Sequence, residues 1–159
     1  MTRAAALLWL TPLAAAGCGY SVGPDALYAH RSVRVDVADA LTERRTHEFD
    51  LTQAVIRQLQ ADGVRVNAPD ATTRLKLVIL DIREPALVES DLDVVTVASV
   101  MFRVQLTVID LATGRELASD EHAESASFAP ARGRTRDTAR AEILDRTARW
   151  VASKLEKDW

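Results

Sequence analysis

The stretch Val94-Val95-Thr96-Val97-Ala98-Ser99-Val100-Met101-Phe102-Arg103-Val104-Gln105-Leu106-Thr107-Val108-Ile109-Asp110 decides the fold, because it follows a strand pattern for longer than any other segment. Successive side chains of a strand point to opposite faces, so this period of two predicts one long β-strand. Its core face consists of the even positions Val94, Ala98, Val100, Phe102, Val104, Leu106 and Val108. At ~3.3 Å per residue the stretch would extend about 55 Å, so we expect a bulge, a bend or a start nearer Thr96.

The odd positions of this strand form a second face of mixed polarity. If helices cover only the first face, the second must meet either water or a partner, and the composition leaves both open. Its candidate partner-facing residues are Val95, Val97, Met101 and Arg103.

The segments next to the long strand predict the rest of a sheet. Residues 110–115 form a tight connection in which Gly114 supplies the positive φ that such hairpin turns need. Residues 116–128 return as a strand that is poor in β-formers, which is typical of a sheet edge. On the other side, the apolar run 74–84 predicts a central strand covered on both faces, ended by Pro85 and followed by an acidic connector over 87–93.

Further elements precede these strands and follow them. Residues 32–38 predict a first strand with Val33, Val35 and Val37 toward the core, and residues 64–66 a short edge strand. A helix that Thr46 or Asp50 can cap shares a stripe of Leu51, Val55, Ile56 and Leu59 and ends at Asp62-Gly63. A last helix over about 135–155 places Ile143, Thr147, Val151 and Leu155 on the sheet, with Trp150 at the margin of the core.

The element order is therefore β-α-β-β-β-α. It predicts an α+β two-layer sandwich, in which a mainly antiparallel four-stranded sheet carries two helices on one face. We expect residues 32–159 to form a single domain, because no linker or repeat divides them.

The start of the chain has the layout of a signal peptide. Arg3, an apolar core of about ten residues and a small-residue exit precede the only cysteine, Cys18. This pattern predicts a lipoprotein signal over residues 1–17, cleavage before Cys18, and an N-acyl diacylglycerol group on Cys18 as the anchor. An ordinary secretory signal is the alternative. Residues 18–31 show neither the helical nor the strand periodicity, which predicts an extended tether. By resemblance to sorted envelope lipoproteins, Gly19 points to the outer membrane.

Composition excludes several functions. The net charge of −3 gives no general attraction to nucleic acid, and an acylated Cys18 leaves no thiol for catalysis or metal binding. No nucleophile motif or phosphate-binding loop occurs, so we predict a non-enzyme without a further cofactor. Asp120, His122 and Glu124 would share one strand face and could hold a divalent ion, but a solvated edge-strand face, without a metal, is the favoured interpretation.

Four arginines lie close together before and within the last helix: Arg132, Arg134, Arg136 and Arg140. A helix N-terminus with several guanidinium groups suits a phosphate or another anion. The alternative is a solvated arginine-rich face, and Asp137 and Glu142 nearby would neutralise part of the charge.

Several short motifs resemble those of the LPS-assembly lipoprotein LptE family. They are the start Gly17-Cys18-Gly19-Tyr20-Ser21-Val22-Gly23, the helix opening Glu48-Phe49-Asp50-Leu51-Thr52-Gln53-Ala54, the strand Leu77-Val78-Ile79-Leu80-Asp81-Ile82, and the strand and hairpin from Val104 to Gly114 with Asp110-Leu111-Ala112-Thr113-Gly114. In element order the similarity covers most of the mature chain.

The resemblance implies a domain anchored in the inner leaflet of the outer membrane. Such a domain plugs the lumen of the β-barrel LptD and assists the delivery of lipopolysaccharide (LPS) to the cell surface. The alternative is another envelope lipoprotein that acts as a structural or regulatory accessory of a secretion pore or a cell-wall synthase.

Overall fold

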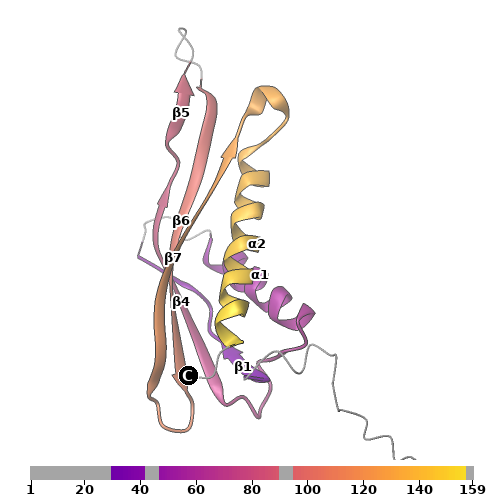
Figure 1. Cartoon of the computed structure of the whole chain (residues 1–159), viewed down its shortest axis with the longest axis vertical. Coiled ribbons are helices and arrows are strands. Elements are labelled where there is room, and N and C mark those ends of the chain that lie inside the picture. Colours follow the sequence, from indigo (N-terminus) through magenta and orange to yellow (C-terminus); the bar gives the residue numbers. More distant parts are fainter. Residues whose placement is uncertain (1–29, 42–46, 90–94, 157–159) are drawn as a thin grey trace, which may run out of the picture.

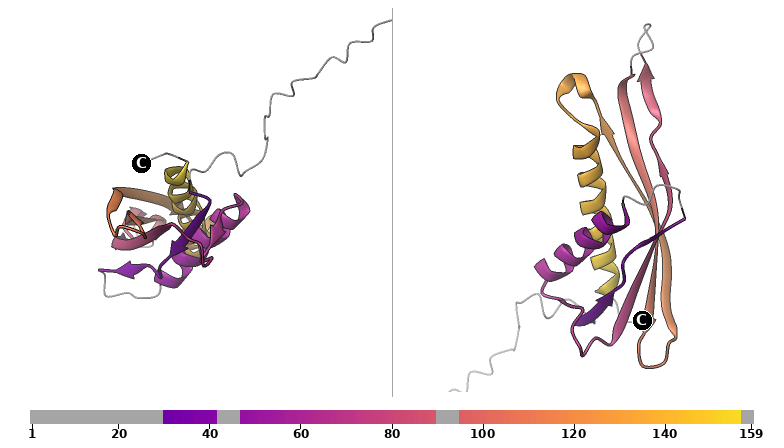
Figure 2. Two further views of the ribbon diagram at one scale, coloured as in Figure 1. Left: turned by 90° about the horizontal axis from the view of Figure 1, so that it is seen from below. Right: turned by 180° about the vertical axis from the view of Figure 1, so that it is seen from behind.

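The computed structural model describes residues 30–41, 47–89 and 95–156. These residues form one sheet with two helices packed together on one of its faces (Figure 1, Figure 2). The strands are β1 (Ser32–Val35), β2 (Asp39–Ala40), β3 (Arg65–Val66), β4 (Thr73–Arg83), β5 (Ala86–Glu89), β6 (Val95–Asp110) and β7 (Glu116–Phe128). The helices are α1 (Glu48–Ala61) and α2 (Arg136–Leu155). The α+β class and the single helical layer are as predicted.

The sheet is mixed rather than mainly antiparallel and four-stranded, which corrects the prediction. Strand β4 pairs in parallel with β1 and β2, and β1 pairs in parallel with β3. The antiparallel pairs are β4 with β6, β5 with β6, and β6 with β7. Between β1 and β4 the chain crosses over through α1, and a crossover of this kind returns the chain in the same direction. The predicted short edge strand over 64–66 is confirmed as β3, and the strands that were not predicted, β2 and β5, have two and four residues.

The core lies between β6 and the helices, as the alternation predicts. The even positions of β6 from Ala98 to Val108 are buried, and Phe102 is among the largest fully buried side chains. They meet the predicted stripes of the helices, whose buried members include Leu51, Val55 and Leu59 of α1 and Ile143, Thr147, Val151 and Leu155 of α2. The expected irregularity of the long strand occurs mainly as shifts of register in its neighbours, between Ile79 and Asp81 of β4 and opposite Val108 and Ile109.

Other predictions about the first half of the chain need correction. Val37 is 70% exposed, because β1 ends at Val35 and the next buried residue is Ala38, whose N–H donates to Thr52 Oγ1 at 2.9 Å. Asp50 lies within the first turn of α1 rather than at its cap, and Thr46 lies outside the described residues. Gly63 does adopt the predicted left-handed conformation after α1, at φ 82°.

Strand β4 is central, yet the described residues cover only one of its faces. Leu75, Leu77 and Ile79 are buried under the helices, whereas Arg74 and Lys76 are exposed on the other face. The predicted connector after Pro85 begins with β5 (Ala86–Glu89). The predicted turn at Gly114 (φ 69°) and the edge position of β7 are confirmed.

Candidate functional site

The four predicted anion-site arginines lie together where β7 passes into α2. Arg132 ends a 3-10 turn, and Gly133 (φ 72°) then redirects the chain. Arg136 begins α2, and Arg140 follows one turn later. The helix is capped by Thr135, whose side chain accepts a hydrogen bond from the N–H of Thr138 at 3.2 Å. This loop lies at the end of the molecule where α2 starts (Figure 1).

Three of the four arginines already have carboxylate partners. Arg134 pairs with Glu142, Arg136 Nη2 lies 3.0 Å from Glu84 Oε2, and Arg140 Nη1 lies 3.8 Å from Asp137 Oδ1. Within the described part of the chain, Arg132 has no ion pair. The cluster is therefore largely neutralised, and Arg132 is the guanidinium best placed to meet an anion.

A pocket of about 240 Å³ lies beside Arg132 and Arg134. Its remaining lining is Val97, Ser127, Phe128 and Ala129. The pocket thus joins one residue of the predicted partner-facing surface with two of the predicted anion-site arginines. Apolar walls with guanidinium groups suit a ligand that has an anionic group next to an apolar part.

Figure 2 shows that one face of the sheet carries no helix among the described residues, and Met101 and Arg103 of β6 point to that face because the even positions of β6 are buried under the helices. Met101 is 39% exposed there, and Arg103 Nε lies 3.9 Å from Glu121 Oε2 of β7. Val97 is half-buried, and the side chain of Val95 falls outside the described part. Met101 lies opposite Arg83 of β4 and Ser125 of β7, and further along β6 Thr107 lies opposite Lys76, so polar side chains share this open face.

Asp120, His122 and Glu124 share one face of β7, as predicted, but that face lies against α2 rather than against water alone. Asp120 pairs with Lys154, and the ring of His122 stacks on Trp150 with centroids 4.6 Å apart. His122 Nε2 also lies 3.1 Å from Glu124 Oε1. Trp150 packs against the core, which confirms its predicted place at the core margin.

The electrostatics of these residues fit a role in holding α2 on β7. The hydrogen bond from Lys154 holds the pKa of Asp120 below its ordinary value, while partial burial acts in the opposite direction. Arg146 Nη1 of α2 lies 3.7 Å from Glu124 Oε2. Among the described residues no group of three or more His, Cys, Asp or Glu side chains is arranged to hold a metal ion.

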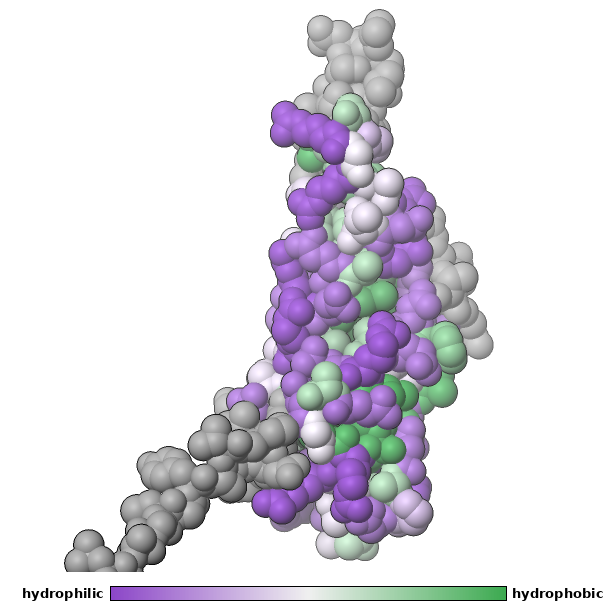
Figure 3. Space-filling view, turned by 90° about the vertical axis from the view of Figure 1, so that its right-hand side faces the viewer, coloured by the Kyte–Doolittle hydropathy of each residue, from purple (hydrophilic) through white to green (hydrophobic). Residues whose placement is uncertain are grey.

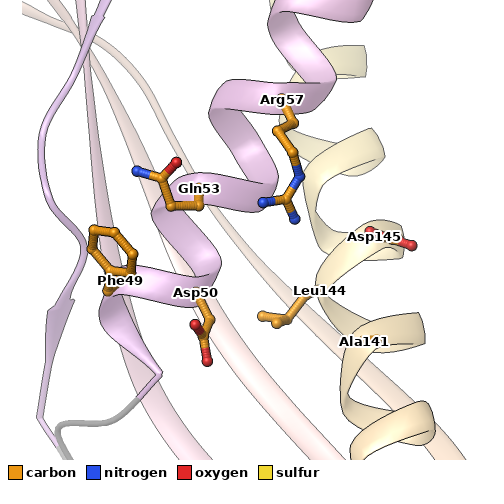
Figure 4. A pocket seen from close by; sticks show the side chains of 7 residues that line it. All are labelled: Phe49, Asp50, Gln53, Arg57, Ala141, Leu144 and Asp145. Carbon is orange, nitrogen blue, oxygen red and sulfur yellow. The ribbon is translucent and has the colours of Figure 1, made fainter.

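A second groove, of about 230 Å³, lies between the two helices (Figure 4) and was not predicted. It is lined by Phe49, Asp50, Gln53 and Arg57 from α1 and by Ala141, Leu144 and Asp145 from α2. Phe49 is 65% exposed because it lies off the buried stripe of α1. This position off the apolar stripe is visible in the sequence, and it is the signal that could have revealed an exposed aromatic ring here. On the helical side of the molecule, Figure 3 shows hydrophobic residues between largely hydrophilic ones.

The predicted anchor, Cys18, lies outside the described residues, as do the signal and most of the tether. None of the helices in the described ranges is both long and apolar enough to span a membrane.

Comparison with known proteins gives structural neighbours only: no family model and no curated protein matches the chain. A PelC dodecamer from Paraburkholderia phytofirmans is 18% identical with a TM-score of 0.59, over 86% of this chain and 94% of that one. Protein XCC0632 from Xanthomonas campestris is 13% identical with a TM-score of 0.60, over 84% and 90%. The uncharacterized lipoprotein B from Nitrosomonas europaea is 12% identical with a TM-score of 0.58, over 82% and 85%. At these identities the similarity shows a shared fold.

Proposed function

We propose that this protein is a bacterial envelope lipoprotein of the LPS-assembly translocon. Acylated Cys18 anchors it to the outer membrane, where it faces the periplasm, plugs an LptD-like β-barrel and assists the delivery of LPS to the cell surface. The observation that carries the proposal is the LptE-like set of motifs, of which those within the described residues lie on the helix, strands and turn predicted for them. The motif from Glu48 to Ala54 opens α1, and the motif from Asp110 to Gly114 forms the turn between β6 and β7. Solved lipoproteins with this fold support the broader class.

The open face of the sheet suits a plug. A polar barrel lumen can accept a sheet face that carries Arg74, Lys76 and Arg103, since these side chains stay solvated there. The pocket beside Arg132 could contact both parts of an LPS molecule, with the guanidinium on a phosphate and Phe128 on an acyl chain. The protein assists transfer as a non-enzyme, and its lipid is an anchor rather than a cofactor.

Co-purification tests the partner. The tagged full-length protein is extracted from outer membranes in mild detergent, and proteins bound to it are identified by mass spectrometry. We expect a large barrel protein in stoichiometric amount, and absence of any barrel would refute the proposal. A Cys18→Ser variant should lose incorporation of a palmitate analogue, and labelling that persists in this variant would refute the anchor.

Binding of purified LPS tests the pocket separately. Arg132→Glu should weaken binding of LPS, because it replaces the guanidinium by a negative charge. This arginine has no ion pair among the described residues, so the charge reversal breaks no ion pair there. The matched control is Arg57→Glu, in the groove between the helices. Equal binding by the two variants and the wild type would remove the pocket from the proposal.

A second candidate function is that of a structural or regulatory accessory of a secretion pore or a cell-wall synthase. The observation that favours it is the fold shared with a protein whose solved structures are dodecamers. Native mass spectrometry of the detergent-extracted protein separates the two proposals, because a homo-oligomeric ring favours the accessory and a complex with one barrel favours the plug.

A further inference from the structure

Strand β7 forms an edge of the described sheet, since it pairs only with β6 among the described strands. On an edge strand, every second residue directs its N–H and C=O away from the sheet. The backbone N–H of Ser99 in β6 donates to the carbonyl oxygen of Pro85. The odd residues of β6 therefore direct their N–H and C=O groups toward β4 and β5. The residues of β7 opposite them, such as Ser125 opposite Met101, therefore direct their N–H and C=O groups away from the sheet. The outward residues are Ser119, Glu121, Ala123, Ser125 and Ser127.

Two side chains cover this outer edge on either side of Ala123. Asp120 Oδ1 accepts a hydrogen bond from the outward N–H of Glu121 at 2.9 Å. Arg146 Nη1 of α2 donates to the outward carbonyl of Ser125 at 3.3 Å. The edge thus has a capped donor and a capped acceptor, one on each side of its midpoint.

Both caps are fixed by α2. Lys154 pairs with Asp120, and Glu142 of α2 pairs with Arg146. Arg146 also lies near Glu124 of β7, with Nη1 and Oε2 at 3.7 Å. The helix that packs on β7 therefore also positions the groups that occupy its edge.

Without the caps, this edge would suit a second copy of the same chain. The strand is 13 residues long and contains neither Pro nor Lys, which are common blockers of edges. Antiparallel pairing of two copies about Ala123 would place His122 opposite Glu124 and Asp120 opposite Ala126. Glu121 would lie opposite Ser125, so no like charges would face each other across the pair.

We propose that the outer edge of β7 is a self-pairing surface that Asp120 and Arg146 keep closed. Loss of both caps opens it to antiparallel pairing with a second copy of this chain. The proposal is independent of which envelope complex the protein serves.

The test measures self-association of the mature chain with Cys18→Ser, which removes the acylation site. Sedimentation velocity over a concentration series compares this protein with its Asp120→Ala, Arg146→Ala double variant. We expect the double variant to dimerise at least about tenfold more tightly. Arg57→Ala, on α1 and away from β7, is the control and should leave the association constant unchanged. A double variant that folds, as judged by circular dichroism, and associates no more tightly than its parent overturns the proposal.

A third variant tests the surface itself. Ala123→Pro removes an outward N–H without breaking the ladder between β6 and β7, a position where edge strands accept Pro. Added to the double variant, it should restore the association constant of the parent protein, and continued dimerisation overturns the proposal. Amide hydrogen exchange in the parent protein tests the caps without mutation. The amide of Glu121 should exchange more slowly than that of Ala123, and equal rates would show that Asp120 does not close the edge.

Discussion

Replacing Phe102 by Ala tests which face of β6 is covered. Phe102 is 1% exposed, and its ring centroid lies 5.4 Å from that of His47, with the rings tilted by 50°. Truncation removes a buried aromatic ring and leaves a cavity between the sheet and the helices. Such substitutions cost about 3–5 kcal/mol of unfolding free energy. That is a large part of the roughly 5–15 kcal/mol typical of a domain.

Urea denaturation followed by circular dichroism measures this loss. With a slope of about 2 kcal/mol per molar, a loss of ~4 kcal/mol lowers the midpoint by about 2 M. The matched control is Met101→Ala, one residue away on the open face, which should change the unfolding free energy by less than about 0.5 kcal/mol. Equal losses for the two variants would refute the one-sided core. Phe102→Leu, which we expect to cost about 1–2 kcal/mol, keeps the comparison measurable if Phe102→Ala does not fold.

Three further substitutions test local features. Asp120→Asn should remove a stabilising contribution that is present above the unfolded carboxyl pKa of about 3.9 and is lost as pH falls through the lowered folded value. Because the side chain is 45% exposed, we expect only a few tenths of a kcal/mol, seen as stability curves of variant and wild type that converge in acid. Gly114→Ala should cost about 1 kcal/mol in thermal denaturation, since φ is 69° although no atom within 4 Å would oppose a Cβ. Thr135→Ala should cost about 1 kcal/mol and speed amide exchange at Thr138, because it removes the N-cap of α2.

The long elements with a regular period could be predicted from the sequence, because the burial of each residue follows directly from the direction of its side chain. The alternation of β6 and the stripe of α2 each extend over many residues, so the buried face is determined many times over. The two-residue strand β2 is too short for any period, and the equally short β3, although predicted as an edge strand, has no period that would indicate its direction. Their parallel pairing depends on the crossover through α1, which the pattern of single segments does not contain.

Val37 shows how a local pattern can fail within a correctly predicted element. Its period places it with Val33 and Val35, but β1 ends at Val35, and beyond it Ala38 rather than Val37 is buried, with its N–H donating to Thr52 Oγ1. That bond joins residues 14 positions apart. Prediction from the alternation alone therefore holds only as far as the strand hydrogen bonds continue.

The sequence indicates only part of the neutralisation of the arginine cluster, because one of its carboxylate partners comes from elsewhere in the chain. Sequence proximity revealed Asp137 and Glu142, whereas Glu84, which pairs with Arg136, directly follows β4 and is distant in sequence. Pairing of three guanidinium groups moves the best anion contact away from the N-terminus of α2 and toward Arg132. There the guanidinium lines a pocket with Phe128 and Val97, so an anion bound at this place would also have to present apolar surface. An amphipathic anion fits that requirement better than a free inorganic phosphate, because the phosphate has no group to place against the apolar wall.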